Sequence, residues 1–165
     1  MRYTRLLRLK TRRLEMKEFK KILFPVDLSE SSEKILPYVQ AVAKKFEAKI
    51  HILFAARVFE YFTSIYVPHP SINKFEKEII DGAEKKLYEF IDKYFKEYPG
   101  TKTVVVAGDA SEEIINYVES QGIDLIIMGT HGRKGLDKVM FGSVAERVVK
   151  TSPVPVLVVN PYKVD

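Results

Sequence analysis

The sequence predicts an α/β fold in which a single open parallel sheet is covered by helices on both faces. Five short apolar segments alternate with four segments whose apolar residues recur at helical spacing. The fourth apolar segment leads directly into a glycine-rich loop that precedes a helical segment, an arrangement suited to binding anions. A length of 165 residues fits one domain with a sizeable core.

The first three elements read strand, helix, strand. Residues 22–26 are apolar and β-favouring, and Asp27 ends the run before a group of helix-capping side chains. Apolar residues then recur at helical spacing through residues 35–46. Pro37 interrupts this stripe and is expected within or near the first turns, where its missing N–H is tolerated. Residues 50–56 form the second apolar strand.

The middle of the chain contains an irregular aromatic segment and the longest helical pattern. Residues 57–71 are interpreted as a lid or a packed surface loop. The helical pattern covers residues 72–98 and is closed by Pro99-Gly100, and its apolar stripe is interpreted as core. Residues 101–107 then form the third strand.

The last third of the chain continues the alternation. A turn at residues 108–111 leads into a short helix, for which Gly122 is the expected C-terminal stop. Residues 124–128 form the fourth strand, and after the glycine loop and the last helix residues 154–159 form the fifth. Parallel strands joined in this way require right-handed crossovers.

Composition excludes several classes of function. The chain has no cysteine, which excludes disulfides and thiolate chemistry, and its three scattered histidines do not suggest a metal site. No apolar run approaches the ~20 residues of a membrane-spanning helix. The N-terminal segment lacks the apolar core of a signal peptide, so a cytoplasmic location is expected.

Charge divides the chain into a basic N-terminal extension, residues 1–19, and an α/β domain, residues 20–162. Residues 1–15 carry six basic side chains and one acid, and the rest of the chain has equal numbers of both. A basic arm can bind nucleic acid or anionic lipid. We favour two simpler interpretations, a solvated extension or a start codon assigned upstream of Met16.

The segment after the fourth strand contains four glycines, Gly129, Gly132, Gly135 and Gly142. Glycine permits positive φ and close approach of a ligand to the backbone, and a helix start offers unpaired N–H groups to an anion. The spacing is neither that of a P-loop nor that of a dinucleotide-binding turn. Phosphate binding is the leading interpretation, and turn glycines without a ligand are the alternative. The Ser143 hydroxyl could cap the last helix or bond a phosphate oxygen.

The spacing Gly129-x2-Gly132-x9-Gly142-Ser143 resembles the G-x2-G-x9-G-[S/T] signature of the ATP-binding branch of the universal stress protein family. Three further segments are similar to other parts of the family pattern, in the same order along the chain. Residues 21–27 resemble its first strand with a terminal acid, residues 106–114 the turn after its third strand, and residues 153–159 its last strand.

The resemblance implies a fold, a ligand and a set of contacts. The fold is Rossmann-like, of the adenine nucleotide alpha hydrolase type, with strand order 3-2-1-4-5. The ligand is ATP, with Mg²⁺ carried by the nucleotide. The implied adenosine contacts are Pro25, Val26, Asp27, Ala55, Met128 and Gly129, and the implied phosphate contacts are Gly132, Gly142, Ser143 and Val144. The family often has Ser or Thr where this chain has Ala145, so one hydroxyl contact is missing here.

Several of these residues have a second interpretation. The Asp27 carboxylate could accept bonds from ribose or an exocyclic amine, or it could cap the following helix. His131, Arg133 and Lys134 could neutralise phosphates, or they could be exposed loop charges. His51 and His69 have no partner constellation and are interpreted as satisfied or solvent-exposed histidines.

The implied function is that of an ATP-binding stress-response or signalling module. Hydrolysis requires a residue that positions water near the γ-phosphate, and no acid in the loop is placed to do so. We therefore expect slow or no turnover, with no catalytic residue assigned. The alternatives are an ATPase or adenylyl-transferring enzyme on the same fold and a nucleotide-free interaction protein.

The fifth strand, residues 154–159, lies at a sheet edge if the implied order holds. A long apolar edge strand needs to be paired or covered. Pairing with its own copy gives a homodimer, and a covered edge in a monomer is the alternative. We expect ATP and an unspecified protein as further partners, and neither a membrane nor nucleic acid.

Overall fold

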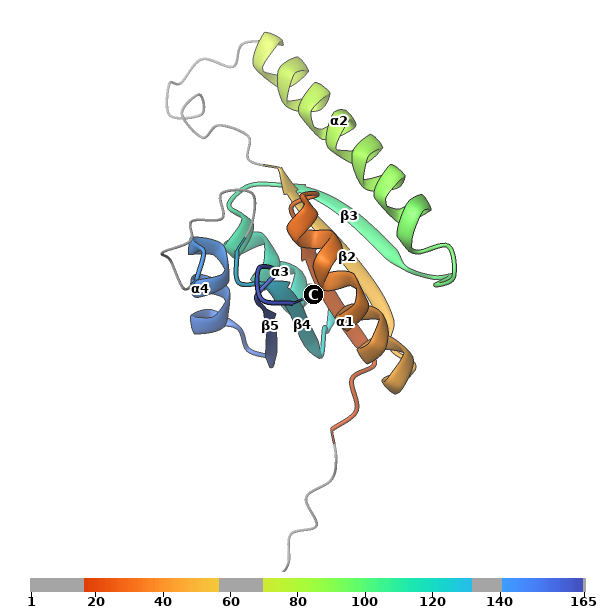
Figure 1. Cartoon of the computed structure of the whole chain (residues 1–165). Coiled ribbons are helices and arrows are strands. Elements are labelled where there is room, and N and C mark those ends of the chain that lie inside the picture. The colour runs from red at the N-terminus through yellow and green to blue at the C-terminus, as the bar shows by residue number, and fades with distance from the viewer. Residues whose placement is uncertain (1–16, 57–69, 132–140, 165) are drawn as a thin grey trace, which may run out of the picture.

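The computed structural model describes residues 17–56, 70–131 and 141–164, and these form strands and helices in alternation (Figure 1). The strands are β1 (Lys21–Val26), β2 (Lys49–Ala56), β3 (Lys102–Ala107), β4 (Leu125–Gly129) and β5 (Val156–Val159). The helices are α1 (Glu30–Phe46), α2 (Pro70–Tyr94), α3 (Ala110–Gln121) and α4 (Ser143–Thr151). The basic residues 1–15, His69 and most of the loop predicted at 57–71 lie outside the described residues.

The strands form one parallel sheet in the order β3-β2-β1-β4-β5, which confirms the predicted fold class and order. The chain moves outward from β1 to β2 and β3, and then crosses back to place β4 on the other side of β1. The strand order therefore reverses between β1 and β4, and the carboxyl ends of these two strands meet at that point.

Helices cover both faces of the sheet, because the central strands are apolar on both sides. Residues of α1 and α2 pack on one face with Ile22, Phe24 and Ile52. Residues of α3 and α4 pack on the other face with Leu23 and Leu53. Successive residues of β1 and β2 thus enter opposite cores, which explains their nearly continuous apolar sequences.

The helix predicted at residues 72–98 ends earlier, at Tyr94. The Phe95 N–H still donates to the Ile91 carbonyl at 2.8 Å, and the chain then turns, with the Tyr98 N–H donating to the Phe95 carbonyl at 3.0 Å. This turn buries the Phe95 ring beside Phe90. Packing of an aromatic side chain therefore ends the helix before Pro99-Gly100 is reached.

Two further expectations concern local chemistry in helices. Pro37 lies inside α1, beyond its first turn, and contributes no N–H to the helical ladder there. Gly122 ends α3 in the left-handed conformation at φ 60°, as predicted, and its N–H donates to the Val118 carbonyl.

His51 is more deeply buried and less fully bonded than expected. Its side chain is 1% exposed on β2, and its Nδ1 lies 3.0 Å from the Tyr117 hydroxyl of α3. Its Nε2 has no hydrogen-bond partner among the described residues. Burial lowers the pKa of His51, and the nearby Lys102 lowers it further. The prediction of a satisfied or exposed histidine was therefore wrong at this position.

None of the helices in the described part of the chain combines the length and the apolar character needed to cross a membrane.

Candidate functional site

A cavity of about 980 Å³ lies at the carboxyl ends of β1, β2 and β4. The starts of α1, α3 and α4 also line it, together with one face of α2. The cavity therefore occupies the point where the strand order reverses, which is the usual ligand site of an open parallel sheet. Its volume lies in the range of small-molecule sites.

The structure brings all but one of the predicted contact residues to this cavity. Those that line it are Pro25, Val26, Asp27, Ala55, Met128, Gly129, His131, Gly142, Ser143 and Val144. Gly132 lies outside the described residues, as do the loop cations Arg133 and Lys134. Residues more than one hundred positions apart in the chain are thus neighbours here because parallel strands end at the same edge.

The Asp27 carboxylate is held by the turn between β1 and α1. Its Oδ1 accepts from the Ser29 N–H at 3.0 Å, from the Ser29 hydroxyl at 2.6 Å and from the Ser32 hydroxyl at 2.7 Å. The N-cap of α1 is Ser29, whose side chain accepts from the Ser31 N–H. Asp27 is therefore not the helix cap. It organises the turn and lines the cavity.

Leu28 gives this turn its unusual shape. Its φ of 59° lies in the left-handed region, which costs a non-glycine residue about 1–2 kcal/mol. Leu28 packs against the core and also lines the cavity. Such strained positions concentrate at functional sites, because the surrounding structure must hold them in place.

At two glycines in this part of the fold the surrounding atoms leave little room for a Cβ. A Cβ on Gly129 would lie 2.8 Å from Ile35 Cδ1 and 3.0 Å from the His131 carbonyl oxygen. A Cβ on Gly142 would lie 3.3 Å from the Thr130 carbonyl oxygen, which accepts from the Gly142 N–H at 2.6 Å. That hydrogen bond joins the two ends of the glycine-rich loop, so the loop begins and ends beside the cavity.

The start of α4 presents backbone N–H groups to the cavity. Its first helical hydrogen bond runs from the Glu146 N–H to the Gly142 carbonyl at 2.9 Å. The N–H groups of Ser143, Val144 and Ala145 therefore have no carbonyl partner within the helix. Gly142 is the N-cap and has no side chain to satisfy them. The prediction that Ser143 could cap this helix was wrong, since Ser143 is its first helical residue.

Charge is sparse on the described walls of the cavity. Among the described lining residues Asp27 and Glu78 are the acids and Lys86 is the single lysine or arginine. Val26 and Met128 are buried and apolar, as is Ala56 at the end of β2. The end near β2 therefore suits an apolar ring, and the end near α4 offers backbone donors for an anion. No group of potential metal ligands occurs among the described residues.

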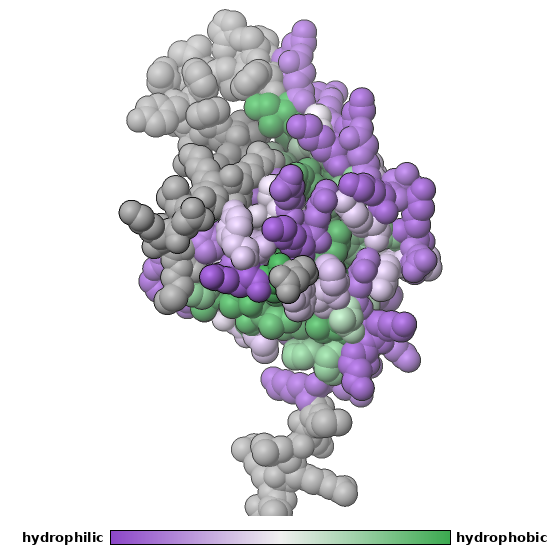
Figure 2. Space-filling view, in the orientation of Figure 1, coloured by the Kyte–Doolittle hydropathy of each residue, from purple (hydrophilic) through white to green (hydrophobic). Residues whose placement is uncertain are grey.

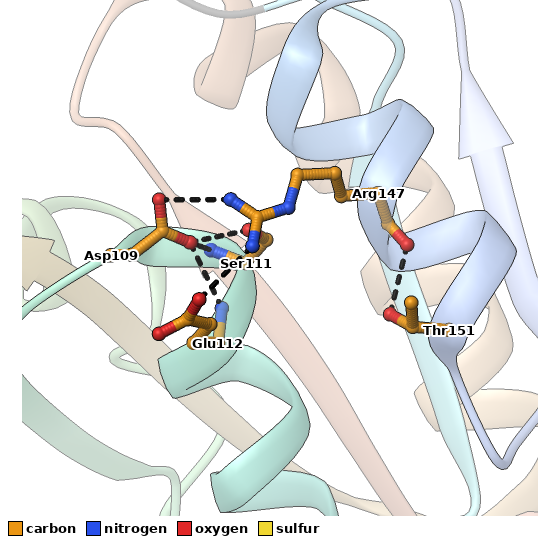
Figure 3. A network of polar contacts seen from close by, with 5 residues as sticks. All are labelled: Asp109, Ser111, Glu112, Arg147 and Thr151. Atoms are coloured by element: carbon orange, nitrogen blue, oxygen red, sulfur yellow. Dashed lines mark hydrogen bonds and ion pairs between the residues drawn. The ribbon is translucent and has the colours of Figure 1, made fainter.

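An ion-pair network fixes α4 against α3 behind this helix start (Figure 3). Arg147 of α4 contacts the Asp109 carboxylate at 3.2 Å and the Glu112 carboxylate at 3.1 Å. Asp109 is also the N-cap of α3 and accepts from the N–H groups of Ser111 and Glu112. The Ser111 hydroxyl, followed by these N–H groups and Arg147, holds the pKa of Asp109 below its usual value.

His131 connects the loop to the C-terminal segment. Its Nδ1 lies 2.8 Å from the Thr130 hydroxyl, and its ring packs edge-on against Tyr162 at a centroid distance of 5.6 Å. The Thr130 N–H donates to the Val159 carbonyl at 2.8 Å. The loop therefore begins at residues that are bonded directly to β5 and the segment after it.

The sequence analysis missed the contribution of α2 to this cavity. Ile79 and Ala83 were interpreted as core, but they line the cavity together with Glu78, Gly82 and Lys86. Gly82 inside a helical stripe was a signal of this arrangement, because glycine is disfavoured in helix interiors. Ser31 and Ser32 at the start of α1 also line the cavity and were considered only as capping residues.

Comparison with known protein families matches residues 18–160 to the universal stress protein family. This chain belongs to the universal stress protein family. It is 32% identical over 155 residues to the universal stress protein MJ0577 of Methanocaldococcus jannaschii, a match that covers 86% of this chain and 95% of the relative. It is also 32% identical to YxiE of Bacillus subtilis, over 86% of this chain and 99% of that protein.

Solved structures of the family share the fold. The structure of MJ0577 superposes with a TM-score of 0.76 at 31% identity and covers 87% of this chain and 97% of its own. A universal stress protein from Lactobacillus plantarum superposes with a TM-score of 0.67 at 22% identity, covering 88% of this chain and all of its own. The five-stranded parallel sheet with helices on both faces is thus common to these proteins.

Proposed function

We propose that this universal stress protein binds ATP in the cavity at the carboxyl ends of β1, β2 and β4, and acts as a nucleotide-dependent stress-response or signalling module. The observation that carries the proposal is the continuity of the cavity from the Asp27 carboxylate to the N-terminus of α4. A carboxylate suits ribose hydroxyls, and a helix start with free N–H groups suits phosphates.

The orientation of the nucleotide follows from the two ends of the cavity. The base lies against Val26, Ala55 and Met128, where the walls are apolar. The phosphates lie at Gly142, Ser143 and Val144, where α4 begins. The triphosphate brings Mg²⁺ with it, since oxygen-rich phosphates and water satisfy that ion without a protein cage.

We propose slow hydrolysis or none. Among the described lining residues the carboxylates are Asp27, after β1, and Glu78, on α2, and no lining residue from the start of α4 carries one. A water molecule near the γ-phosphate therefore has no described carboxylate to position it. An ATPase or adenylyl-transferring enzyme on the same fold remains the alternative function. Hydrolysis kinetics with excess ATP separate the two, because several turnovers per second would contradict a binding module.

A second nucleotide is worth testing beside ATP. One structural neighbour, at 19% identity and a TM-score of 0.57, is a universal stress protein in complex with cAMP. A cyclic monophosphate would leave part of the α4 end of the cavity unfilled. Titration calorimetry with both ligands tests the proposal, and we expect ATP to bind more tightly. The absence of heat with ATP at millimolar concentration would overturn it and favour a nucleotide-free interaction protein.

We further propose that β5 mediates a homodimer. This strand lies at the edge of the sheet, where it has a neighbour on one side only, and Leu157 on it is 39% exposed. An exposed apolar edge strand is stabilised by pairing with a second copy. Light scattering of the purified protein tests this directly. Leu157→Lys is expected to convert a dimer into a monomer, and a wild-type monomer would contradict the proposal.

A further inference from the structure

Gly82 occupies a position in α2 at which its backbone does not require glycine. It lies in the interior of a 25-residue helix, and its φ is not in the left-handed region. A Cβ at this position would meet no heavy atom of the described residues within 4 Å. Alanine would therefore fit and would make the helix more stable, since glycine is the less favourable residue in helix interiors.

The side of α2 that carries Gly82 faces the cavity. Glu78 precedes Gly82 by one turn and Lys86 follows it by one turn, so all three residues lie along one side of the helix. All three line the cavity, as do Ile79 and Ala83 beside them. Val26 and Ala55, the residues assigned to the base of the nucleotide, line the same cavity.

The ion pairs formed in and just after α2 involve charged residues near its C-terminal end. Lys93 pairs with Glu33 at 3.6 Å, and Lys96 pairs with Asp92 at 3.4 Å. Neither Glu78 nor Lys86 forms an ion pair with another described residue. Hydrophilic side chains are frequent on the face shown in Figure 2, and Glu78 and Lys86 are exposed residues that also line the cavity.

We propose that α2 forms the base-side wall of the nucleotide site and that Gly82 is a specificity-determining residue, at which a nucleobase packs directly on bare helix backbone. Glu78 accepts a hydrogen bond from an exocyclic amine of the base, and Lys86 donates to an acceptor atom on its edge. This inference rests on the proposed function, because it assigns a wall to the same ligand.

The position of α2 is consistent with this role. In Figure 1 the N-terminal part of α2 extends beyond the carboxyl ends of the strands, and residues of its middle part line the cavity there. Among the residues of α2 whose burial is described, the buried ones are Ala83, Leu87 and Phe90, and all three follow Gly82 in the sequence. The C-terminal part of α2 thus anchors the helix, and the part around Gly82 is left to contact a ligand.

The test compares Gly82→Leu with Lys85→Leu, which places the same side chain on an exposed position of α2 outside the cavity. Affinities for ATP, adenosine and inorganic tripolyphosphate are measured by competition against a fluorescent ATP analogue. We expect Gly82→Leu to weaken ATP and adenosine about tenfold or more and to leave tripolyphosphate within about twofold of wild type. Lys85→Leu should leave all three within about twofold.

Gly82→Ala provides a second variant that is expected to fold at least as well as wild type. It should raise the melting temperature and still weaken ATP binding by a few-fold, a combination that an unused helix glycine would not give. Wild-type affinity for ATP in both Gly82 variants would overturn the inference and leave the proposed function intact. An equal loss of tripolyphosphate binding would also overturn it. If wild type itself binds no ATP, the proposed function fails, and the inference fails with it.

The proposed role of Glu78 is tested by the relative affinities for ATP and GTP. Adenine carries an exocyclic amine where guanine carries a carbonyl oxygen. A carboxylate at position 78 can only accept a hydrogen bond and favours adenine, whereas an amide can also donate one to guanine. Glu78→Gln is expected to lower the ratio of ATP to GTP affinity while leaving tripolyphosphate binding unchanged. An unchanged ratio would remove Glu78 from base recognition.

Discussion

Two aspartates in this chain have the same local sequence pattern and different uses. Asp27 follows β1 and Asp109 follows β3, and each has a serine two residues later. In both cases the carboxylate accepts from that serine's N–H at 3.0 Å and from its hydroxyl. Asp109 is nevertheless the N-cap of α3, whereas Asp27 lies two residues before the N-cap of α1.

The difference arises from where the chain takes its left-handed turn. After β3 the left-handed residue is Gly108, at φ 148°, and it precedes the acid. After β1 it is Leu28, at φ 59°, and it follows the acid. This displacement of two residues moves the carboxylate out of the cap position, and Ser29 is the cap instead. Asp27 lines the cavity, whereas Asp109 caps α3 and forms an ion pair with Arg147.

We propose that Asp27 is a ligand-binding acid and that Asp109 is a structural one, and the largest expected effect tests this difference. Asp27→Asn keeps the size of the side chain and removes its charge. We expect the dissociation constant for ATP to rise about 10- to 100-fold, the equivalent of about 1.5–3 kcal/mol for a hydrogen bond to a charged group. Titration calorimetry measures this, with Asp109→Asn as the matched control, for which affinity should stay within about twofold. Equal affinities for wild type and Asp27→Asn would remove the distinction.

The second prediction concerns the structural acid. Asp109→Ala removes the cap of α3, and we expect a loss of about 1 kcal/mol in the free energy of unfolding. The pKa of Asp109 is lowered in the folded state, chiefly by the Ser111 hydroxyl. Its contribution is therefore present above the usual carboxyl pKa and is lost as pH falls through the lower folded value. Urea denaturation of both proteins below about pH 4 should show the difference shrinking, and a difference independent of pH would contradict this assignment.

The third prediction concerns His51, whose protonation also makes the stability of the protein depend on pH. Burial lowers the pKa of His51 below its ordinary value of 6.5, so the unfolded chain binds a proton that the folded chain does not. Stability should therefore fall as pH drops below about 6.5 towards the lower folded value. His51→Gln should flatten this part of the pH–stability curve and leave the contribution of Asp109 visible at lower pH. An unchanged slope in the variant would assign the effect to another group.

The smallest expected effect is that of Arg147→Ala. Its side chain is half exposed, at 51%, and exposed ion pairs contribute about 0.2–1 kcal/mol. We expect its removal to destabilise the protein less than Asp109→Ala does, and the loss should diminish in high salt. A loss as large as that of Asp109→Ala would mean that Asp109 acts mainly as an ion-pair partner and only secondarily as a cap.

Much of the fold could be predicted from sequence because the signals were local. Apolar runs and helical spacing gave the alternation of strands and helices, and the common direction of parallel strands put Asp27 and Gly129 at one edge. The strand order could not be derived from pattern alone, because periodicity does not specify which strands are neighbours. The family resemblance supplied it, and the structure confirmed it.

Some features left no readable signal in the sequence. Leucine does not predict a left-handed backbone, so the different positions of Asp27 and Asp109 could not be distinguished. The end of α2 at Tyr94 depends on burial of Phe95 in a core made by distant segments. The apolar stripe of α2 predicted core packing, and apart from Gly82 within it only the tertiary structure shows that part of the stripe faces a cavity instead.

The central claim is that a nucleotide extends from Asp27 to the start of α4. Nuclear magnetic resonance of the isotope-labelled protein during titration with ATP tests it most directly. The account predicts saturable shifts of the backbone amides of Asp27, Ala55, Gly142, Ser143, Val144 and Ala145, with little change at the amides of β5. Shifts confined to other parts of the chain, or none at saturating ATP, would contradict it.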